Sequence, residues 1–222
     1  MISWMGILVG AVLLQGAPMT DAGKAIVADE TARLEACLAT LETDPEAAYE
    51  DGLAWLGNGN RPKARHCVAL ALLELEYFAE AAARLEDLAG APDAGGLDQR
   101  ALYHAQAGSA WLLGGFAEPA IVAFDNALKL KPGELGLLLD RGSAHVLAEN
   151  WLAAIADLDA VLAGRPGDAD ALTLRARAYL AEARYGEALA DVEAAREVVP
   201  EAIDLLVLRG DIREAERVAE AG

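Results

Sequence analysis

Apolar residues recur at steps of three and four along residues 62–202, and this spacing predicts amphipathic helices. Three successive units of 34 residues repeat the pattern, and each has a proline in its closing turn, at position 32: Pro132, Pro166 and Pro200. Each unit holds two helical runs joined by a short polar turn, and no segment alternates like a strand. One such pair of helices cannot bury its apolar face alone, so neighbouring units must stack. The sequence therefore predicts an all-α solenoid.

Aligned on these prolines, the units 101–134, 135–168 and 169–202 agree at the positions that control helix packing. The alignment gives Gly108, Gly142 and Ala176 at position 8; Trp111, His145 and Tyr179 at position 11; Ala120, Ala154 and Ala188 at position 20; and Phe124, Leu158 and Val192 at position 24. Small residues let two helix axes approach closely, and large ones fill the space beside them. This arrangement resembles the tetratricopeptide repeat (TPR) family. The resemblance implies a right-handed superhelix and a general role in binding other molecules.

The pattern weakens toward both ends, as terminal repeats usually do. Residues 62–100 predict a degenerate TPR-like unit with Ala69 at position 8, Ala81 at position 20 and a closing loop that is longer by about five residues. Residues 23–61 predict two N-terminal helices, the second capped by Asp44 before a proline. Residues 203–222 predict a truncated unit followed by a polar capping helix.

Residues 1–22 have the length and apolar core of a signal peptide. The first 20 residues carry no charged side chain, and residues 5–14 form an apolar run about 15 Å long as a helix, half a bilayer core. Cleavage after Ala22 is preferred over Ala17, because Pro18 would follow the earlier cut. The alternatives are an uncleaved membrane anchor or an apolar first helix. We expect a periplasmic or secreted protein, with a cytoplasmic protein as the alternative.

Export changes what the two cysteines predict. In an oxidising compartment Cys37 and Cys67 are expected to form a disulfide that ties the first helix to the degenerate unit. In a reducing compartment both would be small buried apolar residues. Three features follow one another along the chain: a helix that contains a cysteine, Trp55 beside a Gly/Asn turn, and the motif Ala-x-His-Cys. This order also resembles exported bacterial TPR proteins of unassigned role.

The charge balance narrows the classes of partner. Eighteen basic and 36 acidic residues give a formal net charge of −18. Nucleic acids and anionic membranes require clustered Lys and Arg, so neither is an expected partner, and membrane contact is expected only through an uncleaved N-terminus. The simpler explanation of the negative charge is that acidic faces keep an alanine-rich solenoid soluble. The alternative is that the charge serves to bind a dedicated basic partner.

No constellation of residues predicts chemistry. The three histidines, His66, His104 and His145, fall on three different predicted helices, and none has a partner at metal-ligand spacing. No nucleophile motif or phosphate-binding glycine loop is present. We therefore predict a protein that is not an enzyme and uses no metal or cofactor.

Two further columns vary together. Position 7 is arginine where position 23 is aspartate, and both are alanine in the first unit. The residues are Ala107, Arg141, Arg175 and Arg209 at position 7, and Ala123, Asp157 and Asp191 at position 23. The simplest interpretation is an Arg–Asp bridge within each unit. Bridges to the preceding unit, such as Arg175 with Asp157 or Arg209 with Asp191, and unrelated surface charges are the alternatives.

The TPR resemblance also implies a concave groove lined by positions 5, 9 and 12 of the first helices. These positions hold Ala105, Ser109, Leu112, Leu139, Ser143, Val146, Thr173, Arg177 and Leu180. Such a groove is mostly apolar and departs from the family's carboxylate clamp, which needs Lys and Asn. We expect a protein-protein interaction module, a scaffold or assembly factor, that binds an extended peptide or a helix. In the alternative arrangement, the N-terminal helix of the protein itself fills the groove.

Overall fold

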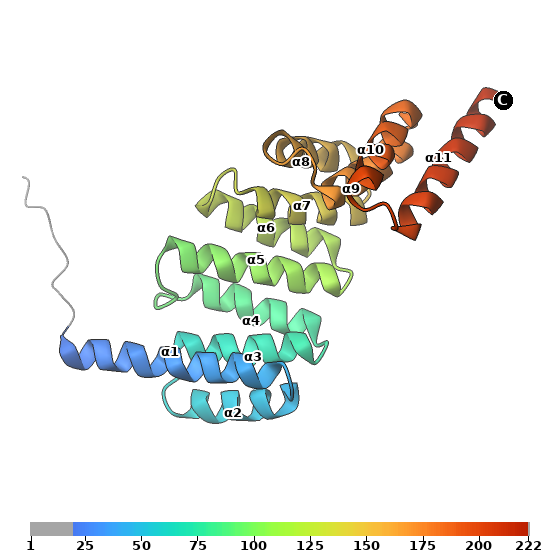
Figure 1. Cartoon of the computed structure of the whole chain (residues 1–222). Coiled ribbons are helices and arrows are strands. Elements are labelled where there is room, and N and C mark those ends of the chain that lie inside the picture. The colour runs from blue at the N-terminus through green and yellow to red at the C-terminus, as the bar shows by residue number, and fades with distance from the viewer. Residues whose placement is uncertain (1–19, 222) are drawn as a thin grey trace, which may run out of the picture.

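The computed structural model describes residues 20–221, which form eleven α-helices and no strand (Figure 1). The helices are α1 (Asp21–Leu41), α2 (Pro45–Gly57), α3 (Pro62–Glu74), α4 (Phe78–Gly90), α5 (Leu97–Leu113), α6 (Ala117–Leu130), α7 (Leu135–Leu147), α8 (Trp151–Gly164), α9 (Ala169–Ala181), α10 (Tyr185–Val198) and α11 (Ile203–Ala221). Each helix packs mainly on its neighbours in the sequence, and the stack runs from α1 and α2 at one end to α11 at the other (Figure 1). The predicted all-α solenoid is confirmed. The proposed signal peptide, 1–22, falls almost entirely outside the described residues.

The turn inside each complete unit has the same backbone geometry. The residue at position 15 adopts a positive φ in four successive helix pairs, at Glu76, Gly115, Glu149 and Ala183. Because this left-handed conformation ends one helix and reverses the chain, each pair closes in three residues. The predicted cap at Asp44 is present, since its carboxylate accepts a hydrogen bond from the backbone N–H of Ala47, and Asp168 caps α9 in the same way through the N–H of Ala171.

The C-terminal part differs from the prediction of a truncated unit followed by a separate capping helix. Residues 203–221 form one continuous helix, α11. Position 15 of this unit is Arg217, which stays helical and forms an ion pair with Glu214 one turn earlier. An i,i+3 pair of this kind supports a helix, and the reversal seen in the other units is missing.

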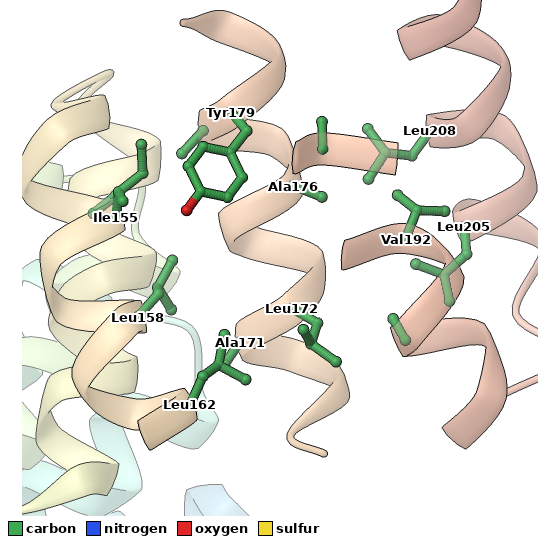
Figure 2. Packing of buried hydrophobic residues seen from close by; sticks show 14 of the residues in the cluster. Ile155, Leu158, Leu162, Ala171, Leu172, Ala176, Tyr179, Val192, Leu205 and Leu208 are labelled. Atoms are coloured by element: carbon green, nitrogen blue, oxygen red, sulfur yellow. The ribbon is translucent and has the colours of Figure 1, made fainter. Parts of the chain in front are cut away.

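The small and large columns pack as predicted. The alanines at position 20 and the large residues at position 24 are fully buried, and Leu158, Ala176 and Val192 lie in one cluster that extends from α8 to α11 (Figure 2). A Cβ atom added at Gly108 would lie 2.6 Å from the ring of Phe124. Position 8 therefore has room for glycine or, where the facing side chain is smaller, alanine.

Ala154→Trp is expected to lower the free energy of unfolding by about 1–3 kcal/mol or more, because it overpacks a fully buried helix crossing. Leu152→Trp on the same helix is the matched control, since Leu152 is 68% exposed. Thermal unfolding followed by circular dichroism gives both values. Equal melting temperatures for the two variants would show that the helix register is wrong.

Arginine at position 7 joins three helices. Arg141 donates from Nε and Nη2 to both carboxylate oxygens of Asp157, at 2.8 and 2.6 Å, and from Nη1 to Asp125 Oδ1 at 2.6 Å. Arg175 repeats this arrangement with Asp191 and Asp159. The bridge within each unit is confirmed. The bridge to the preceding unit goes to position 25 instead of position 23, so the alternative pairing of Arg175 with Asp157 is wrong.

A disulfide joins Cys37 of α1 to Cys67 of α3, and the two Cα atoms lie 6.1 Å apart. Apart from this bond α1 is loosely held, since only Glu30, Cys37 and Leu41 of its residues are buried. The helix packs on α2 and α3, at the end of the stack remote from α9. The disulfide therefore fixes a helix with few buried residues to the body of the solenoid.

Candidate functional site

The first helices of the repeats enclose a hollow of about 440 Å³ on the surface of the stack. Residues from α5, α7 and α9 line it: Leu112, Leu139, Asp140, Ser143, Asp170, Thr173, Leu174 and Arg177. A second hollow of about 330 Å³ lies between α9 and α11, lined by Arg177, Ile203, Asp204, Val207, Leu208 and Asp211. Because Arg177 lines both, the two hollows adjoin. We refer to them together as the groove.

Five of the nine residues predicted for the groove line it, and four do not. Leu112, Leu139, Ser143, Thr173 and Arg177 are the five. Ala105, Val146 and Leu180 are partly buried against the core clusters, and the Ser109 hydroxyl donates to the Ala105 carbonyl at 3.1 Å. Position 12 therefore contributes to packing in the second and third units. No residue of α1 lines the groove, and whether residues 1–19 fill it lies outside the described residues.

The sequence reasoning missed the acidic residues of the groove. Asp170 and Asp204 occupy position 2 of their units, Asp140 occupies position 6 and Asp211 position 9. Position 9 was assigned to the groove in the first three units only. Position 2 lies three residues before position 5, and position 6 lies three before position 9, so they share the same helix face. That periodicity was the signal that could have found them.

The groove has an excess of negative charge. Four aspartates face one guanidinium, and in residues 20–221 no ion pair involves Arg177 or any of these aspartates. Burial raises the pKa of the Asp140 carboxyl, an effect that the positive charge of Arg165 reduces. A cationic group placed in the groove would therefore gain charge pairing that the protein does not supply itself.

The residues considered for metal binding stay apart. His66, His104 and His145 lie on α3, α5 and α7, and the described part of the chain has no cluster of three potential metal ligands. His66 Nε2 lies 2.7 Å from Gln106 Oε1, and burial lowers the pKa of this imidazole. Among the described residues, no helix is long and apolar enough to cross a membrane.

Comparison with known proteins gives matches in structure alone. No protein-family model matches the chain, and no curated protein matches its sequence. A tetratricopeptide repeat protein from Parabacteroides merdae is similar with a TM-score of 0.69 and 16% identity, over 84% of this chain and 73% of that one. MamA from Desulfovibrio magneticus RS-1 gives a TM-score of 0.63 and 22% identity, over 73% and 91%.

A third solved structure contains a bound peptide. The first TPR of Spaghetti (RPAP3), bound to the HSP90 peptide SRMEEVD, gives a TM-score of 0.50 and 23% identity, over 53% of this chain and 94% of that one. Likeness at these identities shows a shared fold. The repeated helix pairs, the buried small and large columns and these similar structures together show that the chain has the tetratricopeptide repeat fold.

Proposed function

We propose that the protein is a non-enzymatic interaction module that binds an extended peptide or a helix of another protein in the groove. The observation that carries this proposal is the pair of adjoining hollows that meet at Arg177, lined by Leu112, Leu139 and Val207 between the aspartates. Val207 is exposed and the two leucines are half-buried, and accessible apolar side chains in a hollow favour a ligand with apolar side chains of its own. The peptide bound by the RPAP3 domain supports a groove of this fold as a peptide site.

The charge of the groove favours a peptide of a different kind from SRMEEVD. That peptide ends in two glutamates, a valine and an aspartate, whereas this groove presents four aspartates and one arginine. Like charges across an interface weaken binding, and opposite charges both steer and strengthen it. The proposed ligand therefore combines apolar side chains with at least one lysine or arginine.

The test uses two labelled nine-residue peptides, three Leu-Lys-Ala repeats and three Leu-Glu-Ala repeats, titrated by fluorescence anisotropy. The lysine peptide is expected to bind, and the glutamate peptide is not. Asp140→Asn with Asp170→Asn is expected to weaken lysine-peptide binding about tenfold or more, as close charge pairs at interfaces couple strongly. The matched control is Glu50→Gln with Asp87→Asn, which removes the same charge from exposed positions outside the groove. An equal loss of lysine-peptide affinity in the groove variant and the control variant would contradict a specific site.

The proposed location is the periplasm or the cell exterior, where the module would act as a scaffold or assembly factor. The uncharged first 20 residues support export, and so does a pair of cysteines close enough to bond. Residues 1–24 fused to a reporter that is active only after export are expected to yield activity. An inactive reporter with intact expression would favour the alternative, a cytoplasmic TPR scaffold or regulator.

A further inference from the structure

The last helix, α11, packs on the solenoid with one face and leaves another face open. Leu205, Leu208 and Ile212 belong to the core cluster, and Leu205 and Leu208 lie beside Val192 of α10 (Figure 2). In the register of the repeat these residues occupy positions 3, 6 and 10, so α11 is equivalent to the first helix of a fourth unit. Positions 4, 7, 8 and 11 would face the second helix of that unit. They hold Leu206, Arg209, Gly210 and Arg213, which we call the open face of α11.

In complete units the same positions are covered. A Cβ atom at Gly142 would lie 3.1 Å from Leu158 and 3.6 Å from the Cβ of Asp157, both on the second helix of its unit. At Gly210 the corresponding space contains no heavy atom within 4 Å. Leu206 is 47% exposed, whereas the equivalent Leu172 is 4% exposed. The open face therefore has the shape of a helix-binding surface without its helix.

Arg209 shows the same gap in its polar contacts. In the two complete units the arginine Nε donates to the aspartate at position 23 of the same unit. Arg209 Nε lies 2.7 Å from Glu193 Oε1 of the preceding unit, yet it is buried and donates no hydrogen bond. The ion pair with the preceding unit, to Glu193, is therefore present. The carboxylate at position 23 of the same unit, which would align with Nε, is missing. Nε therefore has a charged partner but no aligned hydrogen bond, and a carboxylate at position 23 would supply one.

Residues up to 221 cannot supply the missing helix in register. The second helix of a unit begins at position 17, after the reversal at position 15, and both positions lie within the continuous helix α11. The two described helices that have the required pattern, α8 and α10, already bind Arg141 and Arg175. A helix that covered this surface would therefore come from outside residues 20–221.

The charge of the open face indicates what kind of helix fits. Arg209 and Arg213 both lie on it, in a chain whose formal net charge is −18. Most of the protein's surface would repel an acidic partner, and this strip would attract one. In α8 the residues that meet the first helix are Ala154, Asp157 and Leu158, and in α10 they are Ala188, Asp191 and Val192.

We propose that the open face of α11 is a second binding site, separate from the groove, for an acidic amphipathic helix of a partner protein. The helix carries a small residue, then a carboxylate three positions later, and a large apolar residue directly after the carboxylate. The carboxylate binds Arg209, and the apolar residue packs over Gly210 beside Leu206. The site thereby accepts the missing second helix of the fourth unit in trans.

The test uses the full chain and a labelled peptide with the sequence of residues 184–199, which carries this pattern around Asp191. The peptide is expected to bind in fluorescence anisotropy titrations and to shift the amide resonances of residues 206–213. Arg209→Ala in the protein, or alanine in place of Asp191 in the peptide, is expected to weaken binding about fivefold or more. Gly210→Leu is expected to abolish binding, since leucine would fill the space over α11 without touching the folded chain.

Two controls separate this site from the groove and from self-association. Arg177→Ala in the groove is expected to leave binding of this peptide unchanged, and the failure of the groove proposal would not alter that result. No binding, or binding that Gly210→Leu leaves intact, overturns the proposal. Sedimentation of the protein alone is expected to show a monomer at micromolar concentration. A dimer that Gly210→Leu dissociates would assign the open face to a second copy of the chain and overturn the partner-protein proposal.

Discussion

Replacing both cysteines, Cys37→Ser with Cys67→Ser, is expected to release α1 from the solenoid while the repeats stay folded. The disulfide closes a loop with a sequence separation of 30 residues, and the chain-entropy model gives such a cross-link about 3.5 kcal/mol. Besides the disulfide, α1 is held by Leu41 in a core cluster, by a hydrogen bond from Lys63 to Thr31 and by Arg33 over the ring of Trp55. Glu30 is one of its three buried residues, and only one of its carboxylate oxygens has a partner, Arg61 at 3.3 Å. The remaining contacts are too few to offset the entropy of an ordered helix of 21 residues.

Hydrogen exchange measures this release helix by helix. Amides of α1 are expected to lose their protection in the double variant, and amides of α7 to α10 are expected to keep theirs. Contacts in a solenoid link nearest neighbours only, so a loss at one end does not spread through the stack. Reduction of the unmodified protein should reproduce the result, because it removes the same bond without changing a buried side chain's size. Protection of α1 that survives both treatments would show that packing alone holds the helix.

The repeat columns were predictable because each is enforced by a close contact that recurs in every unit. Position 8 must be small where Phe124 or Leu158 packs directly against it, and a 34-residue spacing makes that requirement visible in the sequence. The end of the chain was less predictable. Residues 203–210 keep the pattern of a first helix, and nothing local distinguishes Arg217, which stays helical, from Ala183, which reverses the chain. Whether the chain continues as a helix or reverses at position 15 depends on whether a second helix packs on the first. That is a tertiary effect.

The groove and the arginine bridges were each predicted in part. Position 25 is acidic in all three units, including the first, which has alanine at position 7. A search for covariation within units overlooks this column, because Asp125 binds the arginine of the following unit. The groove was assigned from three positions per helix in three units, which left out the aspartates at positions 2 and 6 and Asp211 at position 9 of the fourth unit. Asp125 acts between units, where a unit-by-unit alignment has no signal, whereas the periodicity of the first helices could have revealed the aspartates at positions 2 and 6.

Removing Arg175 is expected to destabilise the protein more than removing Arg175 and Asp191 together. Asp191 is 6% exposed and accepts two hydrogen bonds from Arg175, so Arg175→Ala leaves a buried carboxylate without its counter-charge. Removing one partner of a buried pair typically costs about 3–5 kcal/mol, and partial exposure of Arg175 places this variant near the lower end. The double variant has the residues of the first unit, in which Ala107 and Ala123 are both fully buried.

A double-mutant cycle in urea unfolding measures the coupling, which is expected to be about 0.5–3 kcal/mol for Arg175 and Asp191. The cycle with Asp159→Ala should give a smaller coupling, because the Asp159 side chain is 53% exposed and water replaces its bond to Arg175. The matched control is Asp157→Ala, which removes an equivalent aspartate that binds Arg141 instead. Its effect should add to that of Arg175→Ala within about 0.5 kcal/mol. Additive behaviour of Arg175 with both Asp191 and Asp159 would mean that these bridges neither stabilise the stack nor set its register.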